Sequence, residues 1–235
     1  MKFYKALDSV KLKKYSEVDK NQFALTFYSK SGFKSSELFD KELKKKVSNF
    51  FADEKRSSLF LSKELTGLKG DFLVLRDFNK NKSEYKKYAW MKGLFANLDK
   101  YAVENAVIYA DTSHLSKDDN FLFDLAKTAE KASYRYTDTN PNTKKELILK
   151  NVSLAVESAS AAQKRVVELG YNVGSGANTA RNLGDRPANH ATPAYIANAV
   201  KGLAKDIGGF SVEILEEKDM KKLGMGCLLS VSRGS

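Results

Sequence analysis

Few side chains in this sequence could perform nucleophilic or metal-dependent chemistry, since the chain has two histidines and one cysteine. His114 lies in a polar stretch with Asp111, Asp118 and Asp119, and imidazole and carboxylate groups are common metal ligands. Their spacing matches no known ligand pattern, and no second histidine is near. We therefore predict no metal site in this stretch.

The other histidine and the cysteine have ordinary structural interpretations. His190 lies in a turn with Pro187 and Asn189, where a capping or surface role is favoured over catalysis. Cys227 begins an apolar run and is favoured as a small buried core residue over a nucleophile. No nucleophile–histidine–acid set has supporting context, so we assign no catalytic, cofactor-binding or metal-binding residue within these 235 positions.

Two glycines are spaced like the start of a dinucleotide-binding fingerprint, namely Gly174 and Gly176. The third glycine of that motif is missing, and the pair does not directly follow a predicted strand. Helix packing or a kink is the favoured interpretation, and cofactor binding is the alternative.

The composition is typical of a globular protein, with 42% hydrophobic and 29% charged residues. No run approaches the ~18 apolar residues of a membrane span, so no membrane partner is expected. The first twenty residues lack the pattern of a secretory signal. One cysteine excludes an internal disulfide framework and fits a reducing cytoplasm, which is the location we expect.

The net charge of +11 is concentrated in the first part of the chain. Residues 1–100 carry 23 Lys and Arg against 13 Asp and Glu, a net charge of +10. Such a surface could attract nucleic acid by neutralising phosphates. Lysine far outnumbers arginine, however, and specific phosphate clamps usually favour arginine. A solvated lysine surface is therefore favoured, with weak DNA binding or partner binding as the alternative.

The residue pattern that predicts secondary structure is clearest after residue 190. Thr192 is a good helix N-cap, and Pro193 suits the first helical position. Four apolar residues then repeat at helical spacing and form one stripe: Ile196, Val200, Leu203 and Ile207. Gly208 and Gly209 supply the stop.

A strand is predicted over 210–215, then a short helix over 218–223 that ends at Gly224, then a buried parallel strand over 227–231. Two strands and two helices bury little apolar surface against ~1–2 kcal/mol of backbone entropy per residue. We therefore expect this stretch to be the start of a larger α/β domain.

The N-terminal part alternates between strand and helix patterns. Strands are predicted over 22–28, 57–61, 71–78, 106–110 and 147–156. Helices are predicted from a Ser36 cap to about residue 51, over 82–100, and from an Asp119 or Asn120 cap to residue 132. In the first helix, the inward-facing residues are expected to be Phe39, Leu43, Val47 and Phe50. The helix over 82–100 carries Tyr85, Trp90, Leu94 and Leu98, and Trp90 is expected to be a core residue. No helix or strand is predicted over residues 1–20.

A self-contained α/β layer structure of about 155 residues follows from this order. The alanine-rich stretch 158–183 is expected to be helical, interrupted at Gly170 and at 174–176.

The C-terminal stretch resembles the leucyl aminopeptidase family, the M17 metallopeptidases. The matching motifs are TARNLGDRPAN (179–189), TP (192–193), VEILEEK (212–218), KLGMG (222–226) and LSVSRGS (229–235). Asp185-Arg186 stands where Asn-Glu is commoner in the family, and Ser232 replaces a glycine. Further upstream the similarity is faint, and it is clearest at 132–136 and 147–156.

The resemblance implies an α/β fold in three parts. These are an N-terminal macro-domain-like α/β sandwich (1–156), a connecting helix (157–186), and the truncated start of an α/β aminopeptidase catalytic domain (187–235). It also implies a cytosolic exopeptidase that uses two divalent metal ions, commonly manganese, zinc or magnesium, to release N-terminal amino acids from peptides.

The family's metal ligands and catalytic residues would all lie downstream of Ser235. We therefore expect no metal bound to this chain and no activity from it alone. The complete enzyme would be a homo-hexamer.

Overall fold

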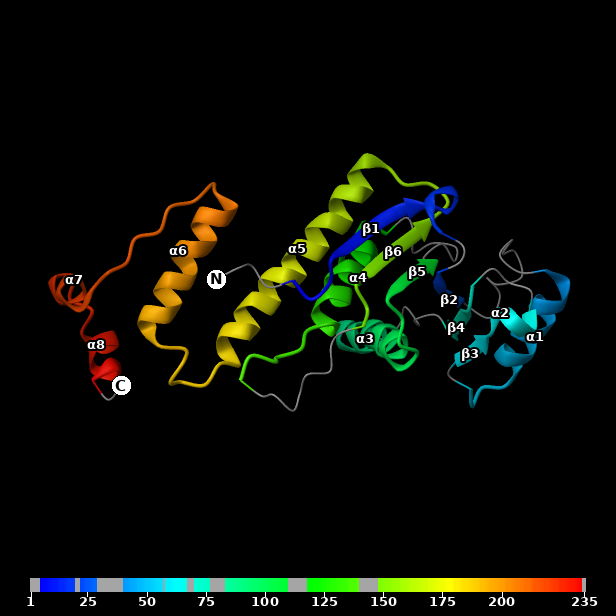
Figure 1. Ribbon diagram of the computed structural model, residues 1–235, viewed down its shortest axis with the longest axis horizontal. Coiled ribbons are helices and arrows are strands. Elements are labelled where there is room, and N and C mark those ends of the chain that lie inside the picture. Colours follow the sequence, from blue (N-terminus) through cyan, green and yellow to red (C-terminus); the bar gives the residue numbers. More distant parts are fainter. Residues whose placement is uncertain are drawn as a thin grey trace. The chain divides into compact units, whose positions relative to one another are not determined.

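A computed structural model describes residues 5–19, 22–28, 40–56, 58–66, 70–76, 83–109, 118–139 and 148–233 (Figure 1). The chain divides into two compact units, which within the described residues are 5–182 and 183–233. The division falls between Asn182 and Leu183, and the domain boundaries proposed from the sequence at 156/157 and 186/187 stay predictions.

The first unit is built on one six-stranded sheet with the order β1-β6-β5-β2-β4-β3. The strands are β1 Ser9–Lys14, β2 Phe23–Tyr28, β3 Ser58–Leu61, β4 Phe72–Arg76, β5 Asn105–Tyr109 and β6 Asn151–Val156. The helices of this unit are the 3-10 helix η1 Tyr15–Glu17, α1 Lys41–Ala52, α2 Lys63–Thr66, α3 Glu84–Lys100, α4 Asp119–Ala132 and nearly all of α5 Ala161–Gly184. Neighbouring strands are parallel except for β3, which pairs antiparallel with β4.

Successive residues of the central strands point to opposite faces of the sheet, as strand geometry requires. Leu73, Ile108 and Leu154 belong to the core under α3, α4 and α5. Val74 and Val107 belong to a second core under α1. The sheet is therefore buried on both faces between helices, which confirms the predicted α/β sandwich.

The N-terminal strand β1 was not predicted. It pairs in parallel with β6, with Ser9 opposite Asn151, and buries Val10 and Leu12. Lysines alternate with these two apolar residues, so the segment reads as charged although every second side chain faces the core.

Two predicted helix starts differ from the structure. The side chain of Asp40 caps α1 by accepting a hydrogen bond from Leu43 N at 2.8 Å, whereas Ser36 and Phe39 lie outside the described residues. Asp118, not Asp119 or Asn120, caps α4. Both caps are aspartates, whose oxygens suit the free N–H groups of a first turn.

The prediction that Trp90 of α3 is a core residue is only partly confirmed. Leu94 and Leu98 are buried, but Trp90 is half-buried at the edge of the core, with its ring centroid 6.3 Å from that of Phe121. Tyr85 is 79% exposed. Both residues lie in the first half of the helix. The buried residues of α3 begin only at Met91.

The long helix α5 runs through the glycines without interruption, so the predicted breaks were wrong. A Cβ at Gly170 would clash with the carbonyl oxygen of Phe123. A Cβ at Gly174 would lie 2.9 Å from the carbonyl oxygen of Lys127. These two glycines allow the backbone of α5 to approach α4 closely, which confirms the packing interpretation.

The second unit contains α6 Pro193–Ile207, α7 Glu217–Lys222 and α8 Gly226–Ser232. Thr192 caps α6 by accepting a hydrogen bond from Tyr195 N at 3.3 Å, and Gly208 ends it with φ +73°, both as predicted. Gly224, with φ +70°, follows the predicted short helix.

Both strands predicted in this second unit were wrong. Residues 211–216 have no strand assignment, and α8 covers the apolar run 227–231. Within residues 183–233 no strand is described that could accept the backbone hydrogen bonds of another, whereas a helix pairs these groups internally. Cys227 is exposed on α8 instead of buried.

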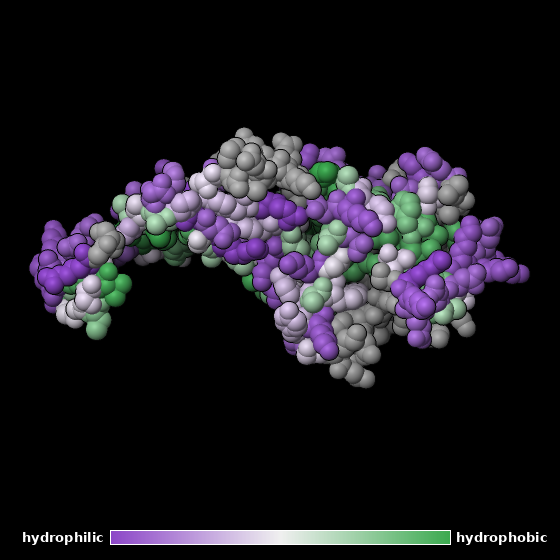
Figure 2. Space-filling view, turned by 90° about the horizontal axis from the view of Figure 1, so that it is seen from below, coloured by the Kyte–Doolittle hydropathy of each residue, from purple (hydrophilic) through white to green (hydrophobic). Residues whose placement is uncertain are grey.

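Several large apolar residues of this unit are at the surface. Ile196 of the α6 stripe is 41% exposed, Ile207 is 58% exposed, and Val231 of α8 is 80% exposed. Hydrophobic residues are visible at the end of the chain that holds α7 and α8, at the left of Figure 2.

Candidate functional site

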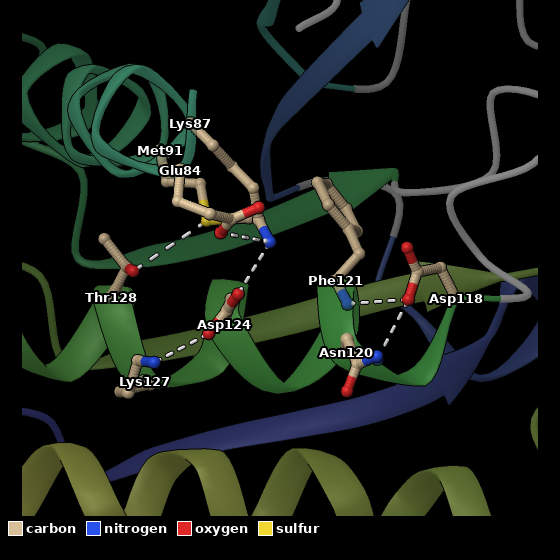
Figure 3. A network of polar contacts seen from close by, with 9 residues as sticks. All are labelled: Glu84, Lys87, Met91, Asp118, Asn120, Phe121, Asp124, Lys127 and Thr128. Carbon is tan, nitrogen blue, oxygen red and sulfur yellow. Dashed lines mark hydrogen bonds and ion pairs between the residues drawn. The ribbon is translucent and has the colours of Figure 1, made fainter. Parts of the chain in front are cut away.

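The residues that the sequence singled out for metal chemistry do not form a site among the described residues. His114 and Asp111 lie outside the described ranges. The carboxylate of Asp118 accepts hydrogen bonds from Asn120 N at 3.0 Å and Phe121 N at 3.1 Å, so it is used as a helix cap (Figure 3).

His190 and Cys227 are both exposed. The backbone N–H of His190 donates to the carbonyl of Pro187 at 2.8 Å within the predicted turn. Over the described part of the chain, no group of three or more His, Cys, Asp or Glu residues could hold a metal ion. The described residues therefore do not fit a two-metal centre.

A polar network joins α3 to α4 (Figure 3). The Lys87 ammonium lies 2.8 Å from the Asp124 carboxylate and 3.2 Å from that of Glu84. Asp124 also binds Lys127 at 2.6 Å. On the same side Thr128 Oγ1 lies 3.9 Å from the sulfur of Met91.

These contacts shift the pKa values of Lys87 and Asp124 toward their charged forms. Burial alone would lower the pKa of Lys87, but its bonds to Asp124 and Glu84 outweigh burial and raise it. Burial alone would raise the pKa of Asp124, but Lys127 and Lys87 outweigh burial and lower it. A carboxylate held ionised between two ammonium groups is a poor proton acceptor, so this network fastens two helices.

A fully buried carboxylate, Glu130, lies further along α4. Its two oxygens accept hydrogen bonds from Ala6 N at 2.6 Å and from Leu7 N at 2.9 Å. Asn178 of α5 donates to one of these oxygens at 3.2 Å and to the backbone carbonyl of Glu130 at 2.8 Å. Glu130 thus ties the chain before β1 to α4 and α5.

Burial raises the pKa of Glu130 above its ordinary value, although the hydrogen bonds from Ala6, Leu7 and Asn178 partly oppose the shift. The Ser175 hydroxyl faces the same carboxylate and favours its charged form, but it makes no hydrogen bond of good distance and angle. Next to this group, the Tyr171 hydroxyl donates to Leu7 O at 2.7 Å. Burial, and then the charge of Glu130, raise the pKa of Tyr171 to about 12.

A third polar feature is a pocket of about 320 Å³ on the first unit. Its lining residues are Tyr88, Lys92, Lys131, Ala132, Tyr134, Arg135 and Arg181. Four of them are cationic and none is acidic. No local sequence pattern indicates this pocket, because its cations come from α3, the end of α4, the residues just after α4, and α5.

No helix in the described ranges is both long and apolar enough to cross a membrane.

The C-terminal stretch of the chain matches a known protein family. The family model "Cytosol aminopeptidase family, catalytic domain" matches residues 178–235. These residues comprise the end of α5 and the second unit, and they contain all the motifs that carried the resemblance.

Curated relatives match a larger part of the chain. A "Probable cytosol aminopeptidase" of Nitrosococcus oceani is 39% identical over 114 residues, which are 47% of this chain and 23% of that protein. A "Probable cytosol aminopeptidase" of Saccharophagus degradans is 34% identical over 155 residues, 60% of this chain and 30% of that protein. The chain therefore spans less than a third of the length of these curated relatives.

The fold has a counterpart among solved structures. A mutant of tomato leucine aminopeptidase superposes with a TM-score of 0.70 at 17% sequence identity, covering 92% of this chain and 46% of the tomato chain. At this identity the similarity establishes the fold alone. It confirms the α/β class predicted from the sequence.

Proposed function

We propose that this chain is the N-terminal portion of a leucyl-type aminopeptidase of the cytosol aminopeptidase family, whose model matches residues 178–235. The observation that carries the proposal is the match of this stretch to the family's catalytic domain. The complete enzyme would release N-terminal amino acids from peptides.

The proposed reaction requires two divalent metal ions, which manganese, zinc or magnesium would supply. No group of described residues could hold a metal ion, so no step of the reaction is assigned to them. By resemblance, the metal ligands and catalytic residues would lie downstream of Ser235. In this proposal residues 1–235 support and begin the catalytic part, and alone they have no peptidase activity.

The proposal extends to location and assembly. The names of the relatives and the single cysteine support a cytoplasmic location. The family resemblance supports a homo-hexamer for the complete enzyme. The exposed apolar residues of α6 and α8, among them Ile207 and Val231, support a monomeric or aggregation-prone state for the 235-residue chain alone.

A direct assay tests the proposal on the isolated chain. The purified 235-residue chain is incubated with leucine p-nitroanilide and manganese, zinc or magnesium, and a characterised leucyl aminopeptidase serves as the positive control. We expect no release of nitroaniline above buffer, and a monomer by light scattering. Metal-dependent turnover that co-purifies with the chain, or a stable hexamer, would contradict the proposal for residues 1–235.

A second candidate function is binding of nucleic acid or a protein partner by the basic first unit. The net charge of +10 over residues 1–100 favours it. Several cations of this unit are already paired with carboxylates, among them Lys87, Lys127 and Lys150. Duplex DNA affinity that falls steeply with salt would support this candidate, and absence of binding at ~0.15 M salt would leave a solvated lysine surface.

A further inference from the structure

The pocket lined by Lys92, Lys131 and Arg181 carries positive charge that the described part of the chain does not neutralise. Its fourth cation, Arg135, is 3.2 Å from the carboxylate of Asp99. No described carboxylate forms an ion pair with the other three cations. Closely spaced cations of like charge repel one another in a concave site, so an anion would be stabilised there.

Aromatic rings hold two of these cations in place. The guanidinium of Arg181 lies 4.2 Å above the ring centre of the buried Tyr134, and Lys131 Nζ lies 5.2 Å from the ring centre of Tyr88. Arg181 also donates one hydrogen bond to the carbonyl of Lys131 at 3.2 Å. The guanidinium is thus fixed on one edge, and its remaining N–H groups stay available to a ligand.

The same stacking restricts the chemistry of the ligand. A cation already covers a face of each of the two tyrosine rings, which makes these rings poor platforms for a nucleobase. A planar guanidinium beside two ammonium groups matches the oxygens of phosphate groups. The volume of about 320 Å³ lies near the lower limit for small-molecule pockets.

We propose that this pocket, formed by α3, the end of α4 and α5, binds the phosphate groups of a small oligophosphate compound. Lys92 and Lys131 would supply point charges and Arg181 a paired hydrogen-bond donor. The site lies wholly within the first unit, and only Arg181 of its lining residues lies in the C-terminal stretch that matches the family model. It does not depend on the peptidase proposal, so either proposal can fail without the other.

The test is calorimetric titration of the 235-residue chain with inorganic tripolyphosphate at ~0.15 M salt. Two single variants remove one pocket cation each, Lys92→Gln and Arg181→Gln. The matched control is Arg165→Gln, which removes the same charge from an exposed position on α5 outside the pocket lining. Lys92 is itself exposed, so its variant is expected to fold.

We expect saturable binding that each pocket variant weakens by roughly tenfold or more, while the control changes it by less than about threefold. Equal weakening by all three variants would show a diffuse charge effect and overturn the proposal. Absence of saturable binding to the unsubstituted chain would also overturn it. Tighter binding of duplex DNA than of tripolyphosphate, with equal sensitivity to all three variants, would assign the charge to nucleic acid instead.

Discussion

The carboxylate of Glu130 accepts a hydrogen bond from the backbone N–H of Leu7 at 2.9 Å, although 123 positions separate the two residues in the sequence. The contact fixes the chain just before β1, the edge strand that pairs with β6. Because Ala6 N donates a hydrogen bond to the other carboxylate oxygen, both oxygens of Glu130 act as acceptors for this segment.

Replacing Glu130 with Gln should destabilise the first unit. Gln offers one acceptor oxygen, so its amide would face a backbone N–H that no longer has an acceptor. We expect a loss of about 1–3 kcal/mol in the free energy of unfolding. Urea unfolding followed by the fluorescence of Trp90, the single tryptophan, measures it. The exposed Glu168→Gln on α5 is the control and should change the free energy little.

The raised pKa of Glu130 also predicts a pH dependence. The folded protein holds this proton more tightly than the unfolded chain, whose pKa is near 4.5. The stability that this proton linkage contributes is therefore fully present below pH 4.5 and is lost as pH rises through the folded pKa. This decline should be missing in Glu130→Gln, and an unchanged pH profile in the variant would show that another group causes it.

Replacing Tyr171 with Phe should remove the hydrogen bond to the carbonyl of Leu7 and cost about 1 kcal/mol. The pKa of Tyr171 is raised from 10.0 to about 12, so the neutral hydroxyl contributes stability that is lost as pH rises between these values. Unfolding experiments at alkaline pH should show this loss in the unsubstituted chain and not in the variant. Tyr85→Phe, at an exposed position, should leave both quantities unchanged.

Substituting Gly170 with Ala should destabilise the first unit by about 1–3 kcal/mol, because the added methyl group meets the backbone of Phe123, which cannot yield as a side chain can. Gly93→Ala is the matched substitution, since a Cβ there meets nothing within 4 Å and α3 gains helix propensity. It should stabilise by about 0.5–1 kcal/mol. A stable Gly170→Ala protein would mean that α5 does not approach α4 this closely.

Asp124→Asn should weaken the contact between α3 and α4 by about 1 kcal/mol, since it leaves the ammonium groups of Lys87 and Lys127 without their shared partner. The lowered pKa of Asp124 adds stability above pH 3.8 that is lost as pH falls through the folded pKa, and the variant should lack this acid sensitivity. Glu104→Gln breaks the exposed pair with Lys150 and should cost little. Equal losses in both variants would contradict a special role for the network.

The elements that the sequence predicted well are those whose pattern is complete within a short window. The stop at Gly208 and the cap at Thr192 depend on neighbouring residues alone, and both are present. The apolar central strands β4 and β5 likewise stand out from polar flanks.

The predictions that failed concern structure that depends on residues far away in the sequence. Val10 and Leu12 become recognisable as strand residues only when β6 lies beside them. The run 227–231 has the composition of a buried strand, but it is helical where no described strand of its unit could pair with it. The basic pocket brings Lys92 and Arg181 together from distant positions, so no local pattern could have indicated it.

The family assignment is tested most directly on the protein as cells make it. An antibody against the 235-residue chain would capture the native protein, whose intact mass and leucine p-nitroanilide hydrolysis are then measured with and without a metal chelator. Since the chain covers 46% of the tomato leucine aminopeptidase chain, we predict a mass roughly twice 26.2 kDa and chelator-sensitive release of nitroaniline. A native protein of 26.2 kDa without peptidase activity would contradict the aminopeptidase proposal.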